Sequence, residues 1–422
     1  MSDIHYDWNR FIHFGCWNNL NEGKGCLLQT MTKLKEYLDD NKLINFLSVA
    51  GDNYYPNKIK NKKTGEKIKT INITKLREGF GLLPENKNIY MVVGNHDLET
   101  NLRILESKDE SKDESKDESK DESKDESKDE SKDESKDESK DENNIETNCA
   151  IINYQKIYMP SNVNYKLNHS LFISNNTLIL MIDSSLYSDD AINFVRCYNV
   201  FLNKEKTLEE LRKDQLGFIK TEICNIKKKN IIDNLIIIGH HPITGLKYKK
   251  KEVILMEDIP YFFSVLYEIY NLFTTQPNYY YLCADLHMFQ NGNIKIQLDE
   301  NKEMNIIQYI VGTGGTELDD NTKILNNSTT YDNSINDYNI SYEMIGSIKN
   351  CGFLDCYYEK GKWNFDFIEN NDDEEKSGGY KKRTRKKKTQ KKRKRNKKTR
   401  KKTRKKRTKK RYKKIRTKKK KN

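Results

Sequence analysis

Three apolar runs in this chain each end in a glycine turn that carries candidate metal ligands. They read Phe-Leu-Ser-Val-Ala-Gly-Asp-Asn-Tyr-Tyr at 46–55, Met-Val-Val-Gly-Asn-His-Asp at 91–97 and Ile-Ile-Ile-Gly-His-His-Pro at 236–242. Short apolar runs bounded by turn residues predict buried strands, and an open α/β sheet places its chemistry where strands end. Asp, Asn and His together suit a cluster of transition-metal ions. The repeated pattern therefore predicts a metal site at the edge of an α/β sheet.

The remaining periodicity predicts the same fold class. Apolar residues at helical spacing predict a helix over 25–38, which returns the chain from a strand at 11–14 to the strand at 46–50. This rhythm of strand, turn and helix implies a sheet that contains parallel strands and has helices outside it. Alternating residues at 352–358 and 363–368 predict a terminal hairpin.

The three turns resemble three of the five sequence blocks of the calcineurin-like metallophosphoesterases. The blocks of that family are G-D-x-[HG], G-D-x-x-Y, G-N-H-[DE], G-H-x-P and G-H-x-H, and the second, third and fourth stand here without change. Tyr55 matches the iron-binding tyrosine of the purple acid phosphatases, so the resemblance is greatest to that branch. It runs from about Phe11 to about Ile368 and implies an α/β fold, a four-layer α-β-β-α sandwich of two mixed sheets.

The first and fifth blocks differ from the family pattern. Gly-Cys-Trp-Asn at 15–18 has Cys16 where the family has aspartate, and Ala-Asp-Leu-His at 284–287 has Asp285 in place of the first histidine. The second histidine is present as His287. A thiolate and a carboxylate can both coordinate a metal, whereas a decayed site would be expected to carry Ala, Ser or Leu. The two substitutions therefore favour a modified metal centre over a lost one.

The resemblance implies two metal ions, divalent or of mixed valence, drawn from Fe, Zn and Mn. Asp52 would bridge the two ions. The other implied ligands are Cys16, Tyr55 and His287 for the first ion and Asn95, His240 and Asp285 for the second. A cysteine ligand favours zinc or iron, and the added carboxylate favours a harder ion such as Mn²⁺.

The resemblance also implies which residues act on the substrate. His96 would contact the phosphate and protonate the leaving group, and Asp97 would orient His96. His241 and Asn53 would support the ligands without touching the metal.

Several of these assignments have a structural alternative. Cys16 could be a small buried thiol, Tyr55 could be a core aromatic residue, and Asp52 could cap a turn. His96 and Asp97 could form a purely structural pair.

The leading functional hypothesis is a dinuclear metal-dependent phosphohydrolase, a phosphomonoesterase of the acid phosphatase type in which a metal-activated water attacks phosphorus. One alternative is a catalytically weak or inactive scaffold of the same fold, anchored to polyanions by a basic tail. A further alternative is a nucleic-acid phosphodiesterase. The natural phosphoester substrate stays open, because leaving-group pockets lie in variable loops.

Charge divides the chain into segments. Residues 381–422 hold 31 of the 77 lysines and arginines and no aspartate or glutamate. Residues 107–142 are nine Ser-Lys-Asp-Glu repeats, which cannot build a core because they contain no apolar side chain. We therefore expect a phosphoesterase domain over 1–370 with the repeat inserted in it, and a disordered basic tail over 371–422. Residues 381–422 should bind nucleic acid or another polyanion without reading its sequence.

The sequence also bears on location and cysteine chemistry. No apolar stretch reaches the ~18 residues of a membrane span, and the polar N-terminus does not resemble a signal peptide. An intracellular (cytoplasmic or nuclear) or virion-associated protein is expected, and its oligomeric state is left open. The eight cysteines form no C-x-x-C pair, so we expect no disulfide framework. The cysteines expected to be small apolar residues in a reducing compartment are Cys149, Cys197, Cys224, Cys351 and Cys356.

Overall fold

The computed structural model describes residues 9–18, 20, 26–60, 67–100, 102–105, 149–173, 175–249, 252–319, 330–335 and 338–370. The chain divides into the unit Met1–Asn370 and the segment Asn371–Asn422. The repeat at 107–142 and the basic tail lie outside the described residues, so the roles predicted for them stay predictions. Among the described residues, no helix has the length and apolar character needed to cross a membrane.

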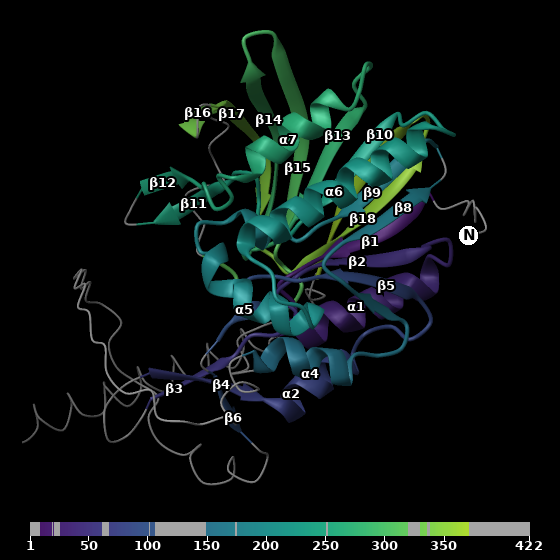
Figure 1. The fold of residues 1–422 in the computed structure, drawn as a ribbon. Coiled ribbons are helices and arrows are strands. Elements are labelled where there is room, and N and C mark those ends of the chain that lie inside the picture. Colours follow the sequence, from purple (N-terminus) through teal and green to yellow (C-terminus); the bar gives the residue numbers. More distant parts are fainter. Residues whose placement is uncertain are drawn as a thin grey trace, which may run out of the picture. The chain divides into compact units, whose positions relative to one another are not determined.

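Two large mixed sheets form the centre of the first unit (Figure 1). The first has the order β19-β18-β1-β2-β5-β7, and the second has the order β16-β17-β14-β15-β13-β10-β9-β8. The strands of the first sheet are β1 (Arg10–Phe14), β2 (Phe46–Ala50), β5 (Asn88–Val92), β7 (Val163–Tyr165), β18 (Gly352–Glu359) and β19 (Lys362–Glu369). Those of the second are β8 (His169–Ile173), β9 (Thr177–Met181), β10 (Asn234–Ile238), β13 (Asn278–Cys283), β14 (Phe289–Asp299), β15 (Lys302–Val311), β16 (Thr330–Ile335) and β17 (Tyr338–Ile348).

Smaller elements surround these sheets. The helices are α1 (Leu27–Asp40), α2 (Ile73–Phe80), α4 (Ala150–Tyr158), α5 (Ala191–Leu202), α6 (Leu208–Lys227) and α7 (Phe262–Asn271), with 3-10 turns η1 (His96–Leu98) and η2 (Ser184–Tyr187). Two small sheets consist of β3 (Asn57–Lys60), β4 (Lys67–Asn72) and β6 (Arg103–Leu105), and of β11 (Leu246–Lys249) and β12 (Glu252–Leu255). The predicted helix, first strand and terminal hairpin are confirmed as α1, β1 and β18–β19.

Side chains on alternate faces of the central strands pack against outer helices or against the other sheet, which gives four layers. In β2, Leu47 and Val49 pack with α1 and α2, whereas Phe46 and Ala50 pack between the two sheets. In the second sheet, alternate residues of β10 likewise pack either with α5, α6 and α7 or between the two sheets. Residues on both faces of these strands are buried, which is why the strands read as continuous apolar runs. The predicted α/β class with two mixed sheets and outer helices is confirmed.

Two disulfides overturn the cysteine prediction. Cys26 pairs with Cys351 at a Cα–Cα distance of 6.4 Å, and Cys149 pairs with Cys197 at 5.3 Å. The prediction that Cys149, Cys197 and Cys351 are unpaired apolar residues is wrong, because partners 48 and 325 residues apart leave no spacing motif in the sequence. Disulfides persist mainly in oxidising environments, which disfavours the reducing compartment assumed for these residues.

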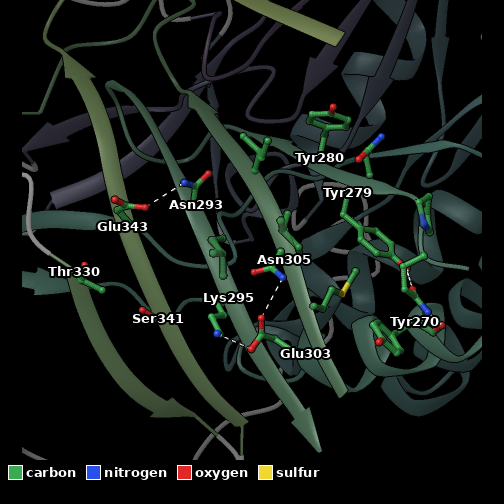
Figure 2. A pocket seen from close by; sticks show the side chains of 17 residues that line it. Tyr270, Tyr279, Tyr280, Asn293, Lys295, Glu303, Asn305, Thr330, Ser341 and Glu343 are labelled. Carbon is green, nitrogen blue, oxygen red and sulfur yellow. Dashed lines mark hydrogen bonds and ion pairs between the residues drawn. The ribbon is translucent and has the colours of Figure 1, made fainter. Parts of the chain in front are cut away.

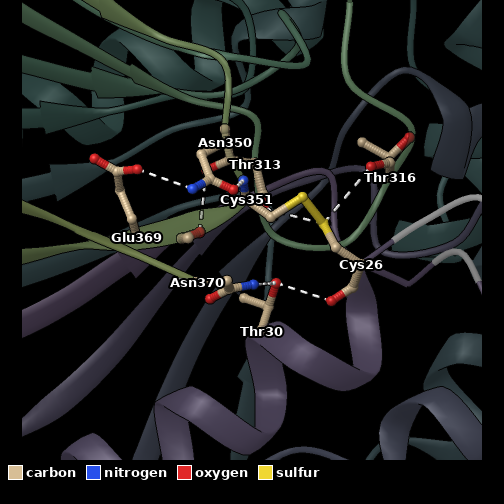
Figure 3. Close-up of a disulfide and its surroundings, with 9 residues drawn as sticks. Cys26, Thr30, Thr313, Thr316, Asn350, Cys351, Glu369 and Asn370 are labelled. Atoms are coloured by element: carbon tan, nitrogen blue, oxygen red, sulfur yellow. Dashed lines mark hydrogen bonds between the residues drawn. A yellow bond between two sulfur atoms is a disulfide. The ribbon is translucent and has the colours of Figure 1, made fainter. Parts of the chain in front are cut away.

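The Cys26–Cys351 disulfide fastens the start of α1 to the turn before β18 (Figure 3). Beside it, Asn370 Nδ2 donates a hydrogen bond to Thr30 Oγ1 at 2.7 Å. The Cys26 amide donates to the Gly315 carbonyl oxygen at 3.1 Å, and the next residue, Thr316, donates to the Cys16 carbonyl oxygen at 3.2 Å. The disulfide therefore supports the loop that carries Cys16.

A groove of about 730 Å³ lies on the eight-stranded sheet, over β13–β17 (Figure 2). Its polar side chains are largely engaged with one another, since Lys295 lies 2.6 Å from Glu303 and Asn293 donates to Glu343 at 3.2 Å. No predicted site residue lines this groove. The candidate chemistry lies elsewhere in the unit.

The disulfide assignment predicts the outcome of thiol labelling. Alkylation of unfolded, unreduced protein should modify four cysteines, Cys16, Cys224, Cys283 and Cys356, as read by peptide mass spectrometry. Cys26→Ser should lower the free energy of unfolding by about 2–4 kcal/mol. Cys224→Ser should change it by less than about 0.5 kcal/mol, because that thiol is exposed and unpaired. Alkylation of all eight cysteines without reductant would contradict the pairing.

Candidate metal centre

The predicted ligands converge at the carboxyl ends of five strands. Strands β1, β2 and β5 are parallel neighbours in one sheet, and β10 and β13 are parallel neighbours in the other. Cys16, Asp52 and Asn95 follow the first three strands, and His240 and Asp285 follow the other two. Parallel strands end at a common edge, so each sheet delivers its ligands to one place.

Three of these residues have strained backbones. Cys16, Asp52 and Asp285 have φ values of 53°, 50° and 56°, in the left-handed region that residues other than glycine rarely adopt. Seven described non-glycine residues have a positive φ, and the other four are three asparagines and Lys360. Each such conformation costs about 1–3 kcal/mol and tends to persist at functional sites.

Glycines make room for this arrangement. A Cβ atom on Gly94 would lie 2.2 Å from the Asp52 backbone nitrogen, and Gly51 has a φ of 77° with the backbone of Gly94 against it. Only glycine allows the turns after β2 and β5 to approach this closely. The glycines of the sequence blocks thus bring Asp52 and Asn95 together.

The two oxygens of Asp52 face different groups. Oδ2 accepts a hydrogen bond from the Tyr55 hydroxyl at 2.8 Å and lies 3.9 Å from Cys16 Sγ. The Tyr55 hydroxyl in turn lies 3.2 Å from His287 Nε2. Cys16, Tyr55 and His287, the predicted ligands of the first ion, therefore gather on the Oδ2 side.

The predicted ligands of the second ion gather on the Oδ1 side. His240 Nε2 lies 3.2 Å from Asp52 Oδ1, 2.9 Å from Asn95 Oδ1 and 3.6 Å from Asp285 Oδ1. The other ring nitrogen, Nδ1, donates to the Ala50 carbonyl oxygen at 2.7 Å. That bond fixes the ring so that Nε2 faces the three oxygens.

The donor atoms fit a metal ion. Those of Cys16, Asp52 and His240 all lie within 4.8 Å of one another, as do those of His240, His241 and Asp285. The three oxygens around His240 Nε2 are all acceptors, and one proton on Nε2 cannot donate to all three of them. Although burial opposes it, Asp52 and Asp285 raise the pKa of His240 well above its usual value. A cation bound beside His240 would therefore interact favourably with these oxygens.

The environment of the Cys16 thiol also favours a bound cation. Burial and the charge of Asp52 raise the pKa of its thiol well above the ordinary value, so a thiolate there needs a cation close by. The side chain is fully buried. This position therefore combines a soft ligand atom with carboxylate oxygens, a set that suits zinc or iron.

His96 is oriented by Glu99 and not by Asp97. His96 Nδ1 makes a short contact with Glu99 Oε1. The other carboxylate oxygen of Glu99, Oε2, lies 2.7 Å from Lys69 Nζ. The His96 amide donates to Asp52 Oδ1 at 3.0 Å. Residues three apart share a face of a 3-10 turn, so η1 places Glu99 beside His96. Sequence reasoning missed Glu99, although the i, i+3 spacing of a histidine and a glutamate was visible.

Asp97 holds the turns together instead. Its carboxylate accepts hydrogen bonds from the amide and side chain of Asn53 at 2.8 and 2.9 Å, from the Gly94 amide at 2.9 Å and from Gln155 Nε2 at 2.6 Å. The side chain is fully buried, and both of its oxygens accept hydrogen bonds from groups other than His96. The prediction that Asp97 orients His96 is corrected for this reason. Asn53, which was predicted to support the ligands, donates to Asp97 from its amide and from its side chain.

His241 lies close to His240 and Asp285. Its amide donates to Ser184 Oγ at 2.8 Å, and burial lowers the pKa of its ring to about 4. The neutral ring is close enough to His240 and Asp285 to offer a nitrogen to the same ion. A second carboxyl group missed by the sequence analysis is Asp258, whose pKa is raised to about 7 by burial and by Asp285.

Comparison with known proteins gives one family. The family model for calcineurin-like phosphoesterases matches residues 1–259. A solved chain titled "Structure of PhoD" has a TM-score of 0.48 and 11% identity, covering 88% of this chain and 69% of that one. No curated protein sequence matches. The family model matches more than half of the chain, and the matched part includes the turns that carry Asp52, Asn95 and His240. This chain therefore belongs to the calcineurin-like phosphoesterase family.

Proposed function

We propose that this protein is a dinuclear phosphohydrolase that cleaves phosphomonoesters in the manner of an acid phosphatase. Membership of the family makes it a metal-dependent phosphoric ester hydrolase; the number of ions, their ligands and the monoester preference are the proposal. The observation that carries it is the Asp52 carboxylate, whose two oxygens face separate groups of donor atoms. A bridging carboxylate between two ions has this arrangement.

The ligand assignment follows from the two sides of Asp52. Asn95, His240 and Asp285 would hold one ion, with His241 close by. The ligands proposed for the other ion are Cys16, Tyr55 and His287. When bound, two such ions would lower the pKa of a water molecule and neutralise charge on the phosphoryl oxygens. The ion beside Cys16 would be zinc or iron, and the ion beside Asp285 would be a harder one such as Mn²⁺.

His96 would act on the leaving group. Its backbone is fixed by Asp52 and its ring by Glu99, and about one third of its side chain is exposed. Asp52 and Glu99 raise the pKa of His96 against the opposing effect of burial. A protonated imidazole at the edge of the cluster can give its proton to the departing alkoxide.

The backbone strain favours an enzyme over an inactive scaffold. Cys16, Asp52 and Asp285 each keep a costly conformation although a scaffold would gain stability by relaxing it. The two altered blocks, at Cys16 and Asp285, therefore share the left-handed backbone of Asp52, which lies in an unaltered block. This supports Cys16 and Asp285 as working ligands.

The bridging role of Asp52 predicts a strong effect of a nearly isosteric change. Asp52→Asn should lower kcat/KM for p-nitrophenyl phosphate by more than about 100-fold, since residues that only support metal ligands already contribute 10–100-fold. Asp299→Asn, in the distant β14–β15 hairpin, should retain wild-type turnover. Equal activity of Asp52→Asn and wild type, each reconstituted with zinc, iron and manganese in turn, would refute the proposal.

The contact between Glu99 and His96 predicts an effect that depends on the leaving group. Glu99→Gln should slow hydrolysis of phenyl phosphate by about 10- to 100-fold and hydrolysis of p-nitrophenyl phosphate much less, because nitrophenolate departs without a proton. Metal content should not change. Glu78→Gln, on the exposed face of α2, is the matched control. A loss of the same size for both substrates would instead indicate a structural role for Glu99.

A further inference from the structure

A cavity of about 550 Å³ opens beside the metal centre. Asn95, His241 and Asp285 form the wall that it shares with the centre. Its other walls come from the segment between η2 and α5, from β11 and β12, and from the residues that follow β12. This volume is in the range of small-molecule sites, and the position beside the predicted ligands suits the leaving group of a phosphoester.

The cavity is strongly acidic. Besides Asp285, its lining carries four carboxylates from two separate segments, at 189–190 and 257–258. Asp189, Asp190 and Glu257 are exposed at the surface of the cavity. Carboxylates lining a cleft of low dielectric reinforce one another and raise the local concentration of cations.

Little positive charge offsets these groups among the described residues. Lys247 is the one cationic residue in the described lining, and its Nζ lies 3.9 Å from Asp319 Oδ2. Arg212, nearby, donates through Nε to the Leu186 carbonyl oxygen at 2.7 Å and lies over the Tyr261 ring. Among the described residues, no lysine or arginine nitrogen forms an ion pair with the carboxylates at 189–190 or 257–258. Glu257 accepts a hydrogen bond from the side-chain amide of Asn333, a neutral donor that leaves its charge in place.

The cavity also offers apolar surface next to the acidic groups. Phe194, Leu255 and Met256 belong to its lining. An ammonium or guanidinium group on an alkyl stem can place its stem on such surface and its charge against the carboxylates. A leaving group rich in phosphate would be repelled.

We propose that this cavity receives a cationic leaving group, so that the preferred substrate is a phosphomonoester whose alcohol carries an ammonium or guanidinium group. This inference rests on the proposed phosphomonoesterase function and adds the substrate class. Asp189 and Glu257, on separate segments of the lining, are the specificity-determining residues. The acidic lining disfavours nucleic acid as a substrate of this site.

The test compares matched substrates of the full-length, metal-loaded protein. One pair is phosphoethanolamine and ethyl phosphate, and the other is a phosphoserine peptide flanked by lysines and the same peptide flanked by glutamates. Exposed ion pairs change affinity about 2- to 5-fold each, so kcat/KM should favour the cationic member about 10-fold at low salt. The contrast should shrink at high salt. A preference in the first pair alone would identify small amino alcohols, and one in the peptide pair alone would identify basic peptides.

Two variants connect this preference to the cavity. Combined Asp189→Asn and Glu257→Gln should reduce it to less than about 2-fold, because the cationic member of each pair then loses two of its carboxylate partners. Glu252→Gln, an exposed carboxylate of β12 outside the lining, is the matched control and should keep the wild-type preference. Each protein keeps its basic tail, so effects of the tail cancel in the comparison.

Failure of the cation preference and failure of the phosphatase proposal give different results. Equal rates for both members of both pairs, or a preference that survives the double variant, would overturn this inference and leave the phosphatase proposal intact. If p-nitrophenyl phosphate is not hydrolysed at all, the phosphatase proposal fails. Calorimetric binding of phosphoethanolamine against ethyl phosphate then decides whether the cavity selects cations, and equal binding overturns the inference.

Discussion

A buried carboxylate, Asp52, forms the centre of the candidate site. Burying a carboxylate is costly unless it is paired and hydrogen-bonded, and here Tyr55, His240 and the His96 amide supply the partners. Each partner comes after a different strand or turn. The position of Asp52 therefore depends on both sheets being correctly aligned. Because of that alignment, each of its two oxygens lies beside a separate group of candidate ligands.

The layers of the fold supply that alignment. The apolar residues between the sheets fix one sheet against the other, and the His240 bond to the Ala50 carbonyl oxygen joins the ends of β10 and β2 directly. The Cys26–Cys351 disulfide supports the loop around Cys16 from the outside. Packing between the sheets and these local bonds together hold three strained residues in place.

Much of the fold and most of the candidate site could be predicted from the sequence because the signals are local. A strand followed by a glycine turn is contiguous, so Asp52, Asn95 and His240 were identified from their own neighbours. Long-range features left no such signal. The partners Cys26 and Cys351 are 325 residues apart, and Asp258 meets Asp285 only in the folded chain. Asp97 was misassigned because sequence adjacency to His96 does not give side-chain direction in a 3-10 turn.

The central claim is that two ions share Asp52, with Cys16 and Asp285 as working ligands on opposite sides. Metal content per chain tests this most directly, measured by mass spectrometry on protein purified without chelator. We expect two equivalents in the wild type, a lower content in Cys16→Ala and in Asp285→Ala, and loss of different metals if the two ions differ. A wild type without bound metal, or two alanine variants that bind metal as the wild type does, would contradict it.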